Sequence, residues 1–230
     1  MVEEAIGKHI LKNKEKKGMG RLVITIARGY GSGGRTMGRL LAEELGINYY
    51  DRELVRLASD KSGISEAMFG EVDERVKTNP FFPRVKRTYH GAGAGPDSAN
   101  FASEENLFHL QAEVIKELAE TEDCIIIGRC ADYVLKDNPN VIRLYCYAPL
   151  KDCMERERAL SGLDDNEIIR KIERIDRNRA DYYKCYTGRN WNDASNYDLC
   201  LNTTSMSYPD LISVVKSYIK VHHPGWLENR

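Results

Sequence analysis

Short apolar stretches alternate with amphipathic ones along this chain. Five stretches are apolar and rich in β-branched or aromatic side chains: residues 22–27, 47–50, 124–127, 141–147 and 197–201. Such runs are typical of buried strands. Because strands that alternate with helices form parallel sheets covered on both faces, the pattern predicts an α/β fold with a five-stranded parallel sheet.

Three segments beside these strands have apolar residues three and four positions apart, which predicts one buried helix face in each. Gly46 follows the first of them, where a helix C-terminal cap belongs. The predicted faces are Met37, Leu40, Leu41 and Leu45; Leu107, Leu110, Val114 and Leu118; and Leu211, Val214, Val215, Tyr218 and Ile219.

Length and charge limit the kind of protein. The 230 residues suit one large domain, or a core with insertions, that folds without disulfides. Thirty-four basic and thirty-five acidic residues nearly cancel, so no overall field favours nucleic acid. No run of eighteen apolar residues occurs, and the lysine-rich residues 1–20 lack the apolar core of a signal peptide. We expect neither a nucleic acid nor a membrane as partner.

The cysteines indicate a reducing environment. They are Cys124, Cys130, Cys146, Cys153, Cys185 and Cys200. No C-x-x-C pair occurs among them, and several interrupt apolar runs, which suits reduced buried thiols better than metal ligands. We therefore predict a cytoplasmic protein.

A glycine-rich loop joins the first predicted strand to the first helix. It fits the phosphate-loop pattern G-x-x-x-x-G-K-[ST], with arginine in place of lysine. Glycines let the backbone curl so that successive N–H groups converge on an anion, and the next helix adds its positive end. The loop consists of Gly29, Tyr30, Gly31, Ser32, Gly33, Gly34, Arg35 and Thr36. We expect it to bind the phosphates of ATP, with Mg²⁺ as the accompanying cofactor.

Arg35 and Thr36 carry the chemistry of this pattern. The basic side chain normally reaches the β- and γ-phosphates, and the hydroxyl meets Mg²⁺. Arg35 is therefore a predicted catalytic residue, and Thr36 is the predicted metal ligand. Arginine has a planar fork where lysine has a compact charge, so the replacement is not conservative. The loop supports nucleotide binding better than catalysis.

Two other interpretations of the loop stay open. Gly29, Gly31 and Gly34 also fit G-x-G-x-x-G, and Asp51 lies near the place of the ribose-binding acid in dinucleotide folds. A glycine-rich turn without a ligand is the other alternative. The pair Arg35-Thr36 favours a polyphosphate, because the dinucleotide fingerprint needs neither a cation nor a hydroxyl there.

A second cluster of chemistry lies between residues 164 and 189, where basic and acidic side chains interleave. An exposed helix with i, i+4 ion pairs explains such a segment. Phosphoryl transfer offers another explanation, because the charge of the moving group is spread over three oxygens and calls for several guanidinium groups. Arg174, Arg177 and Arg179 can supply them.

Several motifs resemble the cytidylate kinase-like group, a divergent branch of the nucleoside monophosphate kinases. D-R-N-R-A at 176–180 looks like the lid motif of bacterial cytidylate kinases, and I-G-R-C at 127–130 is similar to their G-R-D segment. N-T-T at 202–204 resembles the D-T/S-T that ends their last strand, and R-x-Y-G-S-G-G-R at 28–35 is typical of the divergent group. The resemblance covers roughly residues 21–221.

The resemblance implies a P-loop NTPase three-layer fold with a five-stranded parallel sheet, a monophosphate-binding insertion and an arginine-rich lid. Glycines and prolines, including the run at 90–96, predict a mobile loop inside the insertion. The predicted parts are an N-terminal tail at 1–20, a kinase-like domain at 21–221 with the insertion at about 52–105 and the lid at about 161–189, and a C-terminal tail at 222–230.

The same resemblance assigns residues. Arg177 and Arg179 would be the lid arginines that act in catalysis, and Arg129 would contact the acceptor monophosphate. Asp176 matches a lid aspartate near the acceptor's sugar, and pairing with Arg179 or Arg174 is an equally good explanation of it.

Two further carboxylates are predicted to bind the acceptor. Asp51 lies at the end of the second predicted strand, and Asp132 lies two residues after Cys130, which replaces the aspartate of G-R-D.

The implied function is a nucleoside monophosphate kinase-like phosphotransferase that moves the γ-phosphoryl of ATP to CMP, dCMP or another small acceptor. One alternative is a nucleotide-sensing protein without turnover, because the loop lysine and the G-R-D aspartate are both replaced. A less favoured alternative is a dinucleotide-dependent oxidoreductase, which leaves the lid arginines without a role. The sequence makes no prediction of oligomeric state.

Overall fold

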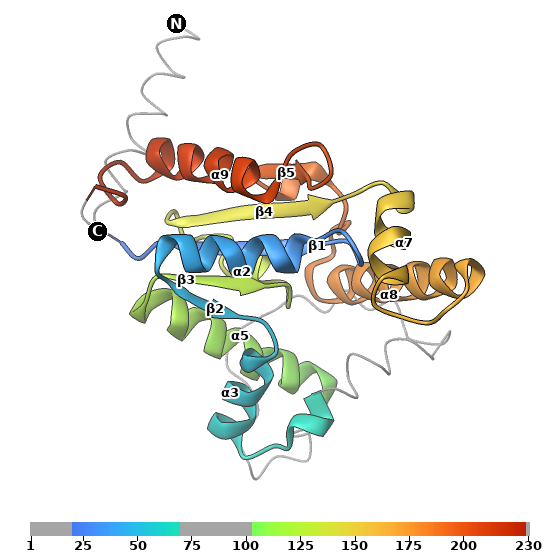
Figure 1. Ribbon diagram of the computed structural model, residues 1–230. Coiled ribbons are helices and arrows are strands. Elements are labelled where there is room, and N and C mark those ends of the chain that lie inside the picture. The colour runs from blue at the N-terminus through green and yellow to red at the C-terminus, as the bar shows by residue number, and fades with distance from the viewer. Residues whose placement is uncertain (1–19, 70–102, 229–230) are drawn as a thin grey trace, which may run out of the picture.

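A five-stranded parallel sheet runs through the centre of the molecule (Figure 1). The computed structural model describes residues 20–69 and 103–228. The strands lie side by side in the order β2-β3-β1-β4-β5, and each neighbouring pair is parallel. They are β1 (Val23–Arg28), β2 (Asn48–Tyr50), β3 (Cys124–Ile127), β4 (Val141–Tyr147) and β5 (Leu199–Asn202). The predicted sheet is confirmed.

The strand order separates two of the functional alternatives. Strand β1 lies between β3 and β4. In the dinucleotide-binding fold the first strand lies between the second and the fourth. The order therefore argues against the oxidoreductase alternative and agrees with the predicted P-loop fold.

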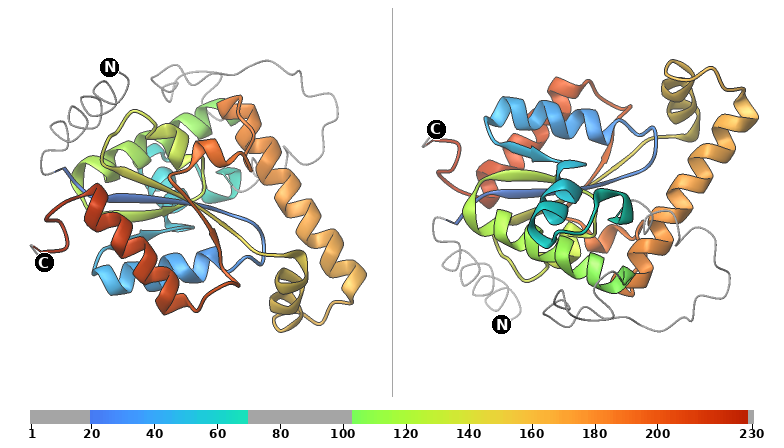
Figure 2. Two further views of the ribbon diagram at one scale, coloured as in Figure 1. Left: turned by 90° about the horizontal axis from the view of Figure 1, so that it is seen from above. Right: turned by 90° about the horizontal axis from the view of Figure 1, so that it is seen from below.

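Helices cover both faces of the sheet, which gives the predicted three layers (Figure 2). Helices α2 and α9 pack on one face, and α5 with the short α6 packs on the other. The helices are α2 (Gly34–Leu45), α3 (Glu53–Ser62), α5 (Glu104–Thr121), α6 (Ala131–Val134), α7 (Leu150–Arg158), α8 (Asp165–Thr187) and α9 (Tyr208–His222), with a 3₁₀ turn η1 (Ala194–Asn196).

Strand β1 shows why the sheet needs both layers. Ile24 and Ile26 contact the α2 and α9 side, whereas Val23 belongs to the cluster with α3, α5 and α6. Its first five residues are all buried. Each fully buried aliphatic side chain contributes about 1.5–3 kcal/mol, so the layers are held mainly by the apolar runs that predicted the strands.

Element boundaries follow the sequence prediction closely. Strands β3 and β4 have the predicted bounds, and Gly46 caps α2 with a left-handed φ of 61°. The fifth strand begins at Leu199 rather than at residue 197. Its predecessor Asp198 turns its carboxylate to the backbone N–H of Arg143, 2.7 Å away, at the edge of β4.

Helices α7 and α8 project beyond the sheet at its carboxyl edge (Figures 1 and 2). Helix α8 fills the predicted lid and runs without interruption for 23 residues. A capping box between Asp164 and Glu167 starts it, and Gly188 ends it with a φ of 71°. The glycine-rich run at 90–96 and the tail at 1–19 lie outside the described residues.

None of the six cysteines forms a disulfide, and all lie in the described residues. Cys124, Cys130, Cys146 and Cys153 are buried as predicted, while Cys200 is exposed. Nowhere in 20–69 and 103–228 is a helix long and apolar enough to cross a membrane. The cytoplasmic location stays a prediction.

Close packing at the start of α2 gives a stability prediction. A Cβ on Gly34 would lie 2.6 Å from Cβ of Cys146 and 2.8 Å from Cβ of Arg28, and both atoms are fixed by strands. We expect Gly34→Ala to lower the free energy of unfolding by about 1–3 kcal/mol, as overpacking does. Gly162→Ala is the matched control, because nothing lies within 4 Å of its new Cβ. Urea unfolding in which both variants match the wild type would contradict this packing.

Candidate active site

The glycine loop leaves the carboxyl end of β1 and leads into α2. Gly31 and Gly33 have left-handed φ angles of 69° and 79°, which favour glycine. A Cβ on Gly31 would also lie 2.9 Å from the carbonyl oxygen of Cys153 in α7. Thr36 is exposed in the first turn of α2. The curled loop and helix terminus thus have the form that the phosphate-loop pattern predicts.

Neighbouring elements hold this loop in place. Arg156 of α7 donates to the carbonyl oxygen of Gly31 at 3.0 Å and to that of Thr203 at 3.3 Å. The Thr203 hydroxyl, directly after β5, donates to the carbonyl oxygen of Ser32. Ser32 Oγ in turn accepts from the N–H of Gly34. Arg156 was not among the predicted site residues.

Beside the loop lies a cavity of about 280 Å³. Its walls come from the ends of β1 and β3, the start of α2, the segment after β2, and α8. Five of the predicted site residues line it. The lining residues are Ala27, Arg28, Arg35, Asp51, Arg52, Gly128, Arg129, Cys130, Asp132, Ile175, Asn178, Arg179, Tyr182, Tyr183 and Trp191.

Asp51 joins the loop to this cavity. Its Oδ2 lies 2.6 Å from Nε of Arg35, and its Oδ1 lies 3.7 Å from Nη2 of Arg28. Arg35 is half exposed and leans towards Asp51, on the side of the predicted acceptor. The predicted contact of Arg35 with the donor's β- and γ-phosphates stays a prediction.

Arg28, the last residue of β1, is a site residue that the sequence analysis did not assign. Its side chain is only 15% exposed and lines the cavity. Burial, and after it the nearby charge of Arg179, lower the pKa of Arg28 to about 9, although the charge of Asp51 acts in the opposite direction. The sequence feature that could have identified Arg28 is its position as a charged residue at the end of an apolar strand.

Helix α8 docks onto the loop through two predicted residues. Asp176 Oδ1 accepts from the N–H of Tyr30 at 2.8 Å and from Nη1 of Arg179 at 3.0 Å. Arg179 also donates to the carbonyl oxygen of Arg28 at 3.1 Å. Burial raises the pKa of Asp176 and lowers that of Arg179. Asp176 thus forms the expected ion pair with Arg179, and Arg179 also lines the cavity.

Arg177 lies apart from this group. It is exposed and does not line the cavity. An α-helix turns by about 100° a residue, so side chains two positions apart point about 200° from each other. Arg177 and Arg179 therefore face different sides of α8. Asn178 lines the cavity instead, and its buried Nδ2 has no hydrogen-bond partner within the described ranges.

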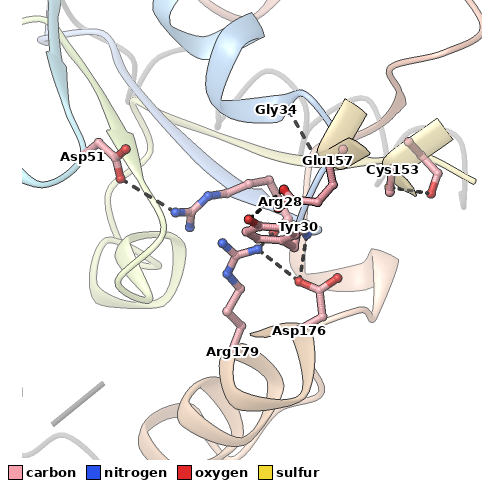
Figure 3. A network of polar contacts seen from close by, with 10 residues as sticks. Arg28, Tyr30, Gly34, Asp51, Cys153, Glu157, Asp176 and Arg179 are labelled. Carbon is pink, nitrogen blue, oxygen red and sulfur yellow. Dashed lines mark hydrogen bonds and ion pairs between the residues drawn. The ribbon is translucent and has the colours of Figure 1, made fainter. Parts of the chain in front are cut away.

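Tyr30 connects the loop to both projecting helices (Figure 3). Its hydroxyl donates to Glu157 of α7 at 2.9 Å, and Lys171 of α8 donates to the same carboxylate at 2.6 Å. Arg179 lies over the ring, with Cζ 5.8 Å from its centroid, within the range of a cation–π contact. Burial opposes ionisation of Glu157, but the bonds from Lys171 and Tyr30 prevail and lower its pKa.

The G-R-C segment after β3 is wound unusually. Gly128, Arg129 and Cys130 have successive left-handed φ angles of 70°, 56° and 54°. Such angles are uncommon outside glycine and gather at functional sites. A Cβ on Gly128 would overlap the guanidinium of Arg28, so a larger residue here would displace that side chain. The strained turn brings Arg129 and Cys130 to the cavity.

Asp132 lies in the cavity wall but is already engaged. The Tyr183 hydroxyl donates to its Oδ2 at 2.6 Å. Burial raises the pKa of Asp132, although the hydrogen bond from Tyr183 acts in the opposite direction. Its predicted contact with an acceptor stays a prediction.

The raised pKa of Asp132 gives a pH-dependent prediction. The folded state binds this proton more tightly than the unfolded state, so the carboxyl's contribution to stability falls as pH rises from about 4 through the folded pKa. Asn can still accept from Tyr183 and does not ionise. We expect Asp132→Asn to melt at a higher temperature than the wild type at pH 7, with the difference shrinking towards pH 4. A variant that melts lower at pH 7 would contradict the buried charge.

Comparison with known sequences identifies the family to which this chain belongs. The profile of the cytidylate kinase-like family matches residues 23–205. A cytidylate kinase of Methanopyrus kandleri is 27% identical over 210 residues, covering 86% of this chain and 93% of that protein. A cytidylate kinase of Pyrococcus horikoshii is 27% identical over 201 residues, covering 86% and 88%.

Solved structures agree on the fold. A protein described as uncharacterized from Eubacterium ventriosum superposes with a TM-score of 0.63 at 22% identity, covering 87% of this chain and 99% of that one. A shikimate kinase of Bacteroides thetaiotaomicron superposes with a TM-score of 0.51 at 15% identity, covering 86% and 98%. With the family profile spanning most of its length, and with a P-loop kinase fold, this chain belongs to the cytidylate kinase-like family.

Proposed function

We propose that the protein is an ATP-dependent kinase that transfers the γ-phosphoryl of ATP to a nucleoside monophosphate, with CMP and dCMP as the first candidates. One observation carries this proposal: the glycine loop and a cavity rich in guanidinium groups lie side by side at one edge of the sheet. The relatives named cytidylate kinase support the choice of candidates.

The donor would lie on the loop and the start of α2. The left-handed turns at Gly31 and Gly33 curl the backbone around an anion site, and the helix terminus favours negative charge. Thr36 is exposed in the first turn of α2, beside Arg35, and its hydroxyl would hold Mg²⁺. When bound, Mg²⁺ offsets the charge of the donor's phosphates.

The acceptor would lie in the cavity, near Arg129 and Asp51. Its phosphate oxygen would attack the γ-phosphorus, the bond from that phosphorus to the bridging oxygen would break, and ADP would leave. Arg179 reaches both the loop and the cavity, so it is the better placed of the two lid arginines to stabilise the charge of the moving group. Arg177 would contact the moving group only if α8 changed its conformation around this residue.

A nucleotide sensor without turnover is the second candidate. The ion pair of Arg35 with Asp51 favours it, because this contact occupies the cation that the phosphate-loop pattern assigns to the donor. The sensor would bind ATP without transferring a phosphoryl group.

Ligand preference gives a first prediction. Mg²⁺ with ATP should raise the melting temperature, whereas NAD should not, because the loop is formed for a polyphosphate. At a ligand concentration of 100 times Kd, the stabilisation is about 2.7 kcal/mol. A thermal-shift screen in which NAD stabilises the protein and no triphosphate does would refute the proposed donor site.

A pair of lid variants gives a second prediction. We expect Arg179→Ala to lower kcat by about 10³-fold, the scale of an arginine that stabilises a moving phosphoryl group, with ATP affinity changed much less. Arg177→Ala is the matched comparison, and we expect less than a tenfold loss because its side chain faces away from the cavity. Both would be measured with the best acceptor among CMP, dCMP, UMP, AMP and GMP. Equal losses in both variants would show that α8 changes conformation at this point.

A further inference from the structure

Arg28 holds a buried positive charge with little to balance it. Its side chain is 15% exposed, and its ion pair with Asp51 spans 3.7 Å, which is longer than a hydrogen bond. Within the described ranges, its guanidinium donates no hydrogen bond to a protein oxygen. A guanidinium has five N–H donors, and buried donors are normally satisfied.

The carboxylate beside Arg28 is already committed. Asp51 pairs with Arg35 at the much shorter distance of 2.6 Å. Arg179, Arg35 and Arg129 lie near enough that their charges lower the pKa of Arg28, in addition to the effect of burial. Arg179 has Asp176 as its partner, but Asp51 is shared by Arg35 and Arg28, and one carboxylate cannot neutralise both guanidinium groups.

We propose that Arg28, the largely buried arginine at the end of β1, binds the phosphate of the acceptor in the cavity. Arg28 would act there with Arg129 and Arg179. This inference rests on the proposed function in one respect, which is that the acceptor occupies the cavity.

The charge of the cavity selects this class of ligand. A phosphate monoester carries nearly two negative charges at pH 7 and presents three terminal oxygens, enough for more than one guanidinium fork. A carboxylate offers one charge, and an uncharged alcohol offers none. The volume of about 280 Å³ is near the lower limit of small-molecule sites, which suits the phosphate end of a nucleotide.

A purely structural role for Arg28 predicts the opposite effect on stability. If Arg28 only pairs with Asp51, replacing it should destabilise the fold. If it is held for a ligand, an uncharged side chain of similar length removes repulsion from the other arginines, and Asp51 keeps Arg35 as its partner. The two roles therefore differ in the sign of the change in melting temperature.

The test compares the wild type with Arg28→Met and Arg28→Lys. Inorganic phosphate is the probe, titrated by ³¹P NMR, with the donor loop saturated by a non-hydrolysable ATP analogue and Mg²⁺. If the analogue does not bind, phosphate can also occupy the loop, and only the part of the binding that the Arg28 variants lose is assigned to the cavity. Arg39→Met is the matched control, because Arg39 is an exposed arginine of α2 that pairs with Glu43.

We expect Arg28→Met to raise the melting temperature without phosphate and to weaken phosphate binding by about 10- to 100-fold, the range for hydrogen bonds to a charged group. Arg28→Lys keeps the positive charge but loses the planar guanidinium, so its affinity for phosphate should lie between those of the wild type and Arg28→Met. Arg39→Met should change neither quantity. If Arg28→Met does not fold, the phosphate affinity of Arg28→Lys relative to the wild type tests the inference instead.

The inference is overturned if the wild type does not bind phosphate in the cavity, or if the Arg28 variants bind it as tightly as the wild type. A wild type that transfers phosphoryl groups, with acceptor affinity independent of Arg28, would overturn only this inference. Phosphate binding that depends on Arg28, without transfer to any nucleotide, would overturn only the proposed function.

Discussion

The shared carboxylate of Asp51 is the contact on which the site depends. It lies where β2 ends, and it binds Arg35 from the start of α2 and Arg28 from the end of β1. Without a carboxylate there, two guanidinium groups would face each other in a partly buried place, and repulsion would push them into solvent. Asp51 thus ties the glycine loop to the cavity, and because it is shared by two guanidinium groups it leaves positive charge beside the cavity.

A second carboxylate repeats this arrangement on the other side of the loop. Asp176 takes the N–H of Tyr30 and the guanidinium of Arg179, which draws α8 onto the loop. Glu157, which is buried and paired with the partly exposed Lys171, supports the same contact through the Tyr30 hydroxyl. Further along α8, Tyr183 and Tyr186 are buried in the core cluster that includes α5. These polar contacts and that apolar packing together determine where the cavity-facing residues of α8 lie.

The sequence predicted what depends on local pattern. Apolar runs and glycine spacing identified the strands, the loop and the cap at Gly46, because burial and left-handed turns leave clear marks in sequence. Contacts between distant segments, such as that of Tyr30 with Asp176, could not be predicted because they depend on how the whole chain folds. The same holds for the burial of Arg28. The separation of Arg177 from Arg179 follows from helix geometry alone, but a motif read as a string of letters hides it.

The central claim is that the loop and the cavity together transfer a phosphoryl group. A single-turnover reaction tests it most directly, with the protein in excess over ATP labelled in its γ-phosphoryl group and with CMP and Mg²⁺ present. The account predicts that the label moves to the nucleoside diphosphate in one exponential phase. Label that stays in ATP, or that appears only as inorganic phosphate with each of CMP, dCMP, UMP, AMP and GMP, would contradict it.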